Sequence, residues 1–288
     1  MSDMPKIDVI IPAYKAQNTI LRTLSSIALQ EIIEDLEVTI VNDADDTFSG
    51  AFALKILRNQ LFAEPYNACC FGSFLEDQRV TYLNHQTDSV WMFGKLYKRD
   101  FIKRYNIHFL PTSRANEDNG FNMMCKLCAN QQEQIKYIQD ITYYWHFKED
   151  SITRIDNANY SYNGSFVGYT DNMIYALKEA EKRVPFNGQI MQQKVMILCN
   201  LYEYWLETGV RDNRYEKQNW DCCVKFYKEI YREIRDKISD QILSDCYNSV
   251  MRNCYMGNKM FGIMPKMGFK EFLENLEKDC QKQEKKKG

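Results

Sequence analysis

The N-terminal half of the chain alternates between short apolar runs and segments with helical spacing. Residues 7–12 form a β-branched run, residues 36–41 form a second apolar run, and residues 19–30 between them carry apolar side chains at three- and four-residue intervals. Runs of this length suit buried strands, and the spacing between them suits an amphipathic helix. The pattern predicts a parallel strand–helix–strand unit, whose ligands bind beyond the carboxyl ends of the strands.

The same half continues with further elements of both kinds. We expect helices over 51–61, 99–105 and 117 to about 131, two short strands over 68–75 and 79–84 that pair with each other, and a further strand over 91–98. Residues 136–140 and 141–147 form two apolar-aromatic segments.

The C-terminal half follows a different pattern, because apolar side chains recur there only at helical spacing. We expect helices over 165–180, 189–208, 219–236, 240–256 and 269–280. Asparagine, aspartate and glycine gather between the two halves, which is typical of a loop. We therefore predict an α/β domain over 1–156 and an all-helical domain over 157–288.

Three carboxylates follow the second apolar run within four residues, as Asp43, Asp45 and Asp46. Such charges repel one another, so a strand end crowded with them suggests a hard divalent cation and its phosphate ligands. The alternative is a solvated acidic turn in which Asp45 caps the next helix. These residues and the strand ends near Pro12 fall where an α/β sheet binds ligands.

Composition and charge narrow the class of protein. The chain has 288 residues, 45% of them hydrophobic, which is typical of a globular protein with a real core. Its net charge of −2, without a basic face, argues against a nucleic-acid partner. No apolar run reaches the length of a membrane helix, and residues 1–6 lack a signal-type apolar stretch. With ten cysteines suited to a reducing compartment, we expect a cytoplasmic protein.

Cys125 and Cys128 form a C-x-x-C spacing inside a helical pattern. No second pair follows at a zinc-like distance, so we expect two packed thiols and not a metal or redox site.

Six segments of the N-terminal half resemble, in order, the motifs of family 2 glycosyltransferases of the GT-A fold. They are Val9–Tyr14, Val41–Asp43, Asp43–Phe48, Gly94–Arg99, Glu117–Asp118, and Tyr143–His146 followed by Ser151–Arg154. The resemblance covers about the first 155 residues. It implies a shortened, GT-A-like (Rossmann-like) three-layer α/β domain in front of the helical one.

The resemblance also implies a donor site for a nucleoside diphosphate sugar. Pro12, Ala13 and Tyr14 would line the base and ribose, and Asp43 would hydrogen-bond the uracil or ribose. Lys95 would be a further donor contact. Asp45 and Asp46 would hold the Mn²⁺ or Mg²⁺ ion on the diphosphate, where it assists departure of the nucleotide.

On the acceptor side, the resemblance makes Asp118 the general base that takes the proton of the acceptor hydroxyl. A carboxylate in the first turn of a helix is kept ionised by the helix dipole, and the same position suits a plain helix cap. Further acceptor or phosphate candidates are Glu117, Trp91, Trp145, His146 and Arg154. The alternative for the aromatic residues is core packing, and for the basic ones a solvated surface.

The chain departs from the family pattern in two places. Lys15 stands where the family has asparagine. The two acidic motifs, which the family separates by further strands and a helix, overlap here on Asp43–Asp45, and no Ala-Arg element precedes Leu61. The simplest hypothesis is an in-frame deletion, which removes part of the nucleotide wall and an arginine that usually helps to hold the nucleotide.

These observations leave two main functions. The first is a metal-dependent, inverting glycosyltransferase that moves a sugar from a nucleoside diphosphate to a hydroxyl of a glycan or another acceptor. The alternative is a catalytically impaired or inactive GT-A-like remnant that acts as a binding or scaffold module. A transferase whose acceptor is a nucleic-acid base or a protein is a third possibility.

Overall fold

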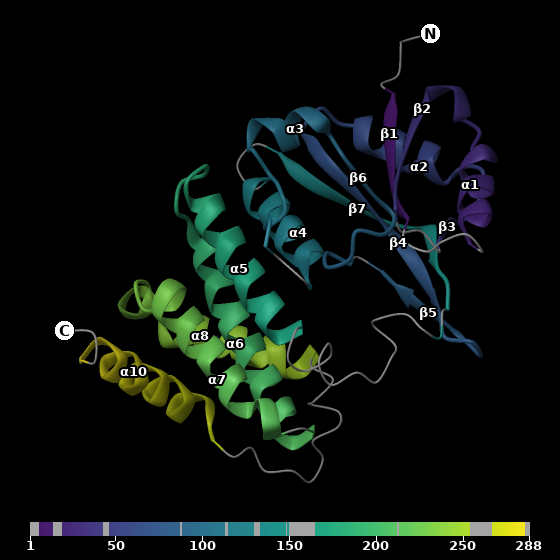
Figure 1. Ribbon diagram of the computed structural model, residues 1–288. Coiled ribbons are helices and arrows are strands. Elements are labelled where there is room, and N and C mark those ends of the chain that lie inside the picture. The colour runs from purple at the N-terminus through teal and green to yellow at the C-terminus, as the bar shows by residue number, and fades with distance from the viewer. Residues whose placement is uncertain are drawn as a thin grey trace. The chain divides into compact units, whose positions relative to one another are not determined.

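The computed structural model describes residues 6–13, 19–42, 46–86, 88–112, 115–129, 133–147, 149, 165–211, 213–253 and 267–285 (Figure 1). The chain forms two compact units. The first comprises residues 1–107 and 129–154, and the second comprises residues 108–128 and 155–288. The division made from the sequence at residue 156 assigned 108–128 to the N-terminal part, whereas its contacts group it with the helices.

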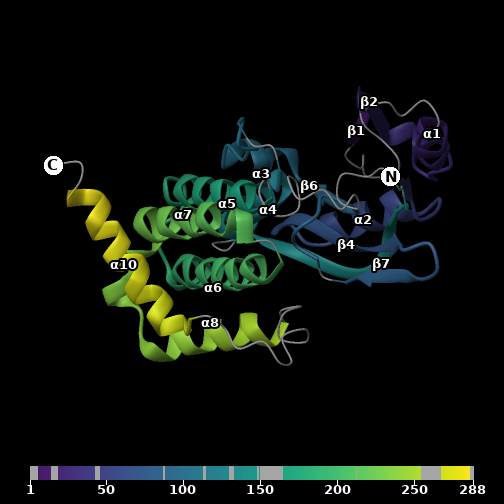
Figure 2. The same ribbon diagram turned by 60° about the horizontal axis from the view of Figure 1, so that its bottom comes forward.

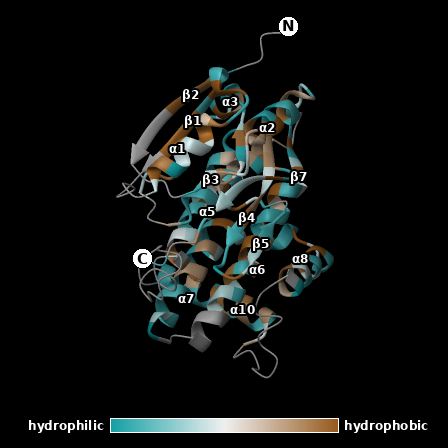
Figure 3. Ribbon diagram, turned by 90° about the vertical axis from the view of Figure 1, so that its right-hand side faces the viewer, coloured by the Kyte–Doolittle hydropathy of each residue, from teal (hydrophilic) through white to brown (hydrophobic). Residues whose placement is uncertain are grey.

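The first unit begins with the expected strand–helix–strand arrangement. Strand β1 (Ile7–Ala13) is followed by helix α1 (Ile20–Ala28), a 3-10 turn (Ile33–Asp35) and strand β2 (Leu36–Asn42). The two strands are parallel and pair in register along their whole length. Figure 3 shows the hydrophobic character of these elements in brown.

This two-stranded sheet is buried on one face. Ile7, Val9 and Ile11 point into the core, whereas Ile10 between them is 68% exposed. Within the described residues β1 pairs with β2 alone. Because parallel sheets normally have both faces covered, the exposed side of β1 is an unusual feature of this unit.

A second sheet carries the rest of the unit. Its long strands, β4 (Asn67–Asp77) and β7 (Gln134–Trp145), are parallel, and the short strands β3 (Thr47–Phe48), β5 (Tyr82–His85) and β6 (Lys95–Tyr97) pair with them antiparallel. The predicted pairing of 68–75 with 79–84 is confirmed by β4 and β5. The segments 136–140 and 141–147 are one strand, with a register shift inside it.

The strand predicted over 91–98 is wrong in its first half. Residues 91–94 form a turn, because Asp88 Oδ2 accepts the backbone N–H groups of Val90 and Trp91 and because Gly94 adopts a φ of 62°. That φ lies in the left-handed region that favours glycine. Only residues 95–97 pair as β6.

Helix α2 (Ala53–Phe62) joins the two sheets into one core. Its Leu54, Leu57 and Leu61 lie in the same buried cluster as β1, Cys70 of β4 and Ile138 of β7. Helix α3 (Arg99–Arg104) follows β6.

The second unit is helical, as predicted. It contains α4 (Glu117–Cys128), α5 (Ser165–Glu181), α6 (Gly188–Arg211), α7 (Glu216–Phe226), α8 (Asp240–Asn253) and α10 (Phe269–Lys285), with a 3-10 turn at Asn213–Tyr215. Figure 2 shows α5, α6 and α7 running side by side. The helix predicted over 219–236 ends its α-helical part at Phe226 and continues as a π turn (Tyr227–Tyr231) and a 3-10 turn (Arg235–Lys237).

Cys125 and Cys128 are both fully buried in α4, which confirms that they are packed thiols. In the part of the chain that the structure describes, no helix has both the length and the apolar character needed to span a bilayer.

Candidate functional site

The start of β3 and the carboxyl end of the antiparallel strand β7 bring Asp46, Thr47 and His146 together. The side-chain Oδ1 of Asp46 accepts the backbone N–H of His146 at 3.0 Å, and Thr47 Oγ1 lies 2.8 Å from His146 Nε2. Thr23 of α1 donates to the backbone carbonyl of Asp46 at 2.7 Å. Three hydrogen bonds therefore fix the segment just after the acidic stretch.

The imidazole of His146 is kept neutral by its surroundings. Partial burial lowers its pKa below the usual 6.5, the positive charge of Arg22 lowers it further, and Asp77 acts in the opposite direction. A neutral ring at pH 7 can either donate to or accept from Thr47, according to its tautomer. The result is a polar group without charge beside the Asp46 carboxylate.

An aromatic cluster formed by Trp91, Phe93, Tyr143 and Trp145 adjoins this polar group in sequence and space. The rings of Trp91 and Trp145 lie 5.0 Å apart, and Phe93 stacks on both Trp91 and Tyr143 at 5.8 and 5.3 Å. All four side chains are half-buried. The two predicted acceptor candidates Trp91 and Trp145 are thus neighbours, and Trp145 directly precedes His146.

Lys95 occupies an enclosed position beneath the turn of residues 88–94. Its side chain is 0% exposed, and its ammonium group lies 3.0 Å from Asp88 and also binds the Trp91 carbonyl. It further lies over the Phe71 ring. In this place Lys95 fixes the turn that carries Trp91.

Glu117 and Asp118 lie in the first turn of α4, in the second unit. Glu117 is exposed, and Asp118 is half-buried with its Oδ1 accepting the N–H of Asn119 at 2.8 Å. Asn116 precedes them at a φ of 59° and donates to the backbone carbonyl and the hydroxyl of Ser165. The start of α4 is therefore tied to the start of α5.

The approach of α4 to α5 depends on a glycine. A Cβ atom at Gly168 would lie 2.4 Å from the Ala115 carbonyl oxygen, which is closer than such contacts occur. Asn172 of α5 donates to the same carbonyl at 2.9 Å. Together these residues fix where Asp118 stands within the helical unit.

Several predicted site residues can be placed only in part. Tyr14, Asp43, Asp45 and Arg154 lie outside the described residues. Pro12 and Ala13 are placed by their backbone, opposite Val41 and Asn42 at the carboxyl end of the first sheet.

Sequence reasoning missed Arg22, Thr23 and Thr47. Arg22 and Thr23 lie in the first turn of α1, and helix N-termini that follow a β-strand are common anion-binding positions. Their position at the start of this helix was the only feature in the sequence that could have indicated a functional role, because a single arginine or threonine is not a motif.

Comparison of the sequence with known proteins gives no match: no family model and no curated protein is similar to it. The structure does have similar solved structures, and its class is the GT-A-type glycosyltransferase fold, an α/β part followed by helices, as predicted.

One such neighbour is S. aureus TarS 1–349, solved as a crystal structure in complex with UDP-GlcNAc. The TM-score is 0.56 at 15% sequence identity, with 88% of this chain and 92% of that chain covered. At this identity the likeness establishes the fold.

Proposed function

We propose that the chain is a family 2 glycosyltransferase that transfers a sugar from a nucleoside diphosphate sugar to an acceptor hydroxyl with inversion. The observation that carries this proposal is the cluster of Asp46, Thr47 and His146 at the strand ends of a GT-A-type fold. It is supported by the nucleotide sugar UDP-GlcNAc in the TarS structure.

In this function Asp45 and Asp46 hold a divalent cation, Mn²⁺ or Mg²⁺. Asp46, which the structure describes, fits a hard cation, because its carboxylate oxygens lie just before β3 and the N–H of His146 orients them. When bound, such an ion stabilises the negative charge that develops on the departing diphosphate. Arg22 supplies a positive charge close to His146, where the family's usual arginine is missing.

Two other groups complete the proposed reaction. Asp118 takes the proton of the acceptor hydroxyl as general base. Trp91 and Trp145 provide an aromatic surface on which an acceptor sugar packs.

A second candidate function, a non-catalytic remnant, is favoured by one specific observation. Ile10 lies exposed on the uncovered face of the β1–β2 sheet, and within the described residues no further strand pairs with β1 or β2. A full-length GT-A domain would be expected to extend this sheet with more strands and to cover its face with a helix. We infer that a segment between the two acidic motifs has been deleted, and the remnant function follows if that deletion also removed donor binding.

Calorimetric titration with UDP, in the presence and absence of Mn²⁺, separates the two functions. The transferase proposal expects metal-dependent binding in the native protein and in Asp100→Asn, a matched substitution at an exposed carboxylate of α3. Asp46→Asn keeps an oxygen for the His146 N–H but removes the charge, and should weaken binding at least about tenfold.

Turnover is tested separately. Asp118→Asn should keep UDP binding and lose release of UDP from UDP-sugars in the presence of an acceptor. Failure of the native protein to bind any nucleoside diphosphate, with either metal, would refute the transferase and leave the remnant.

A further inference from the structure

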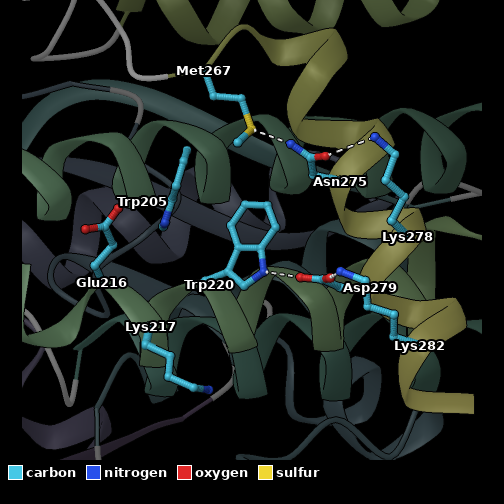
Figure 4. Close-up of a pocket in the computed structure, with 9 residues that line it drawn as sticks. All are labelled: Trp205, Glu216, Lys217, Trp220, Met267, Asn275, Lys278, Asp279 and Lys282. Atoms are coloured by element: carbon cyan, nitrogen blue, oxygen red, sulfur yellow. Dashed lines mark hydrogen bonds and ion pairs between the residues drawn. The ribbon is translucent and has the colours of Figure 1, made fainter.

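The helical unit contains a pocket that the proposed transfer reaction does not use. It has a volume of about 610 Å³ and lies between α6, α7 and α10 (Figure 4). This volume falls within the range of cavities that hold small organic ligands. Because all three helices belong to the second unit, the pocket is complete within that unit.

Two indole rings form the apolar part of this two-tryptophan pocket. Trp205 of α6 and Trp220 of α7 lie with their ring centroids 5.1 Å apart, and the buried ring of Phe272 supports both at 5.7 and 5.6 Å. Figure 4 shows both indoles in the pocket wall, with the side chains of α10 facing them. Trp220 is half-buried, so part of its ring remains available to a ligand.

One donor in this pocket lacks an acceptor. The side chain of Trp205 is only 6% exposed, and its indole N–H has no hydrogen-bond partner among the described residues. In contrast, the N–H of Trp220 donates to Asp279 Oδ2 at 3.0 Å. A buried polar group without a partner is unfavourable, so a ligand oxygen that accepted this bond would gain affinity.

The rim of the pocket presents donors and acceptors side by side. Asp279 binds Lys282 at 2.8 Å, and the Asn275 side-chain oxygen accepts from Lys278 at 3.3 Å. Glu216 adds a second carboxylate. Three lysines, Lys217, Lys278 and Lys282, line the pocket together with these two carboxylates, so the rim carries charges of both signs. Such a rim suits a ligand that both donates and accepts hydrogen bonds better than a wholly apolar one.

A saccharide satisfies both parts of the pocket. Its hydroxyl groups donate and accept, which matches a rim of carboxylates, amide and ammonium groups, and its C–H face packs on an indole ring. We propose that the two-tryptophan pocket binds a saccharide, with one sugar ring on Trp220 and hydroxyl groups at Asp279, Asn275 and the Trp205 N–H. This inference does not depend on the transferase activity.

Saturation-transfer NMR on the full chain, without nucleotide or metal, tests the proposal. The probes are maltotriose, cellotriose and tri-N-acetylchitotriose, with inorganic phosphate as the anionic probe. At least one trisaccharide should bind with a Kd below about 10 mM. Trp205→Phe keeps a ring on Phe272 but removes the donor, and Asn275→Ala leaves the aromatic packing intact; each should weaken binding at least threefold.

A matched asparagine outside the pocket provides the control. Asn248 is exposed on α8 and does not line the pocket, so Asn248→Ala should leave trisaccharide binding unaltered. Trisaccharide binding that is unaltered in both Trp205→Phe and Asn275→Ala, tighter binding of phosphate than of any sugar, or no trisaccharide binding at about 10 mM would each overturn the proposal. Since no sample contains a nucleotide, none of these results depends on whether the chain is a transferase.

Discussion

Replacement of Gly168 by alanine tests the packing that positions Asp118. Inside a helix, glycine to alanine ordinarily stabilises by about 0.5–1 kcal/mol, because alanine restricts the unfolded chain and favours helix. At Gly168 the new Cβ would stand 2.4 Å from the Ala115 carbonyl oxygen. Since that oxygen is backbone, α4 and α5 must separate by at least about 0.6 Å to accept it.

The expected magnitude follows from three contributions. Overpacking of a tight helix contact costs about 1–3 kcal/mol. Separation of the helices also lengthens the hydrogen bond from Asn172 to Ala115, now 2.9 Å, which contributes about 1 kcal/mol. After the gain in helix propensity, Gly168→Ala should lower the free energy of unfolding of the helical unit by about 1–3 kcal/mol.

Gly188 provides the matched control. It is the first residue of α6, a Cβ there would meet nothing within 4 Å, and Asn187 already caps the helix. Gly188→Ala should therefore stabilise by up to about 1 kcal/mol.

Thermal unfolding followed by circular dichroism at 222 nm (about the helical minimum) measures both variants. We expect a fall in Tm of roughly 3–10 °C for Gly168→Ala and a small rise for Gly188→Ala. If Gly168→Ala melted at or above the native temperature, the close contact between α4 and α5 would be refuted.

Two further predictions concern the first unit. His146 should titrate with a pKa below 6.5 in an NMR pH titration, where its signal has to be assigned among only three histidines. This pKa should rise in Arg22→Gln, most clearly at low salt. Because the folded protein binds fewer protons at His146 than the unfolded chain, the neutral ring's contribution to the free energy of unfolding is complete above pH 6.5 and is lost as the pH falls through the folded pKa. If the free energy of unfolding of the native protein stayed constant between pH 7 and 5, and His146→Gln gave the same profile, the lowered pKa would be contradicted. Lys95→Met leaves the mostly buried Asp88 carboxylate without its cation, so urea denaturation should show a loss of about 3 kcal/mol, while UDP affinity of the folded protein stays unchanged. Unaltered stability with weaker UDP binding would instead make Lys95 a donor contact.

Much of the fold could be predicted from local patterns. The β-branched run from Ile7 to Ile11 predicts a strand, and the spacing of apolar residues over 20–28 predicts the helix that follows it. The helices of the second half were recognised for the same reason. Their periodicity repeats over many residues and needs no distant partner to be detected.

The elements that were misassigned depend on individual hydrogen bonds and backbone angles that a hydrophobic pattern does not report. Residues 91–94 carry strand-forming aromatic side chains, yet Asp88 and Gly94 bend them into a turn. The helix predicted to run on to residue 236 changes to π and 3-10 geometry after Phe226. At residues 91–94, hydrogen bonds between near neighbours in the sequence outweigh a strand propensity that amounts to a fraction of a kcal/mol per residue.

For the site, the sequence by itself determined which residue types are available. Carboxylates follow the apolar run 36–41, and aromatic and basic residues such as Trp145 and His146 stand at the end of the segment 141–147. Only the tertiary structure decided which of them meet. Asp46 and His146 are 100 residues apart, and the pairing of β3 with β7 brings them into hydrogen-bond contact. Lys95, a plausible ligand contact by type, is instead enclosed with Asp88. The physical reason is that chemistry is a property of single side chains, whereas burial and proximity arise only when distant strands pack together.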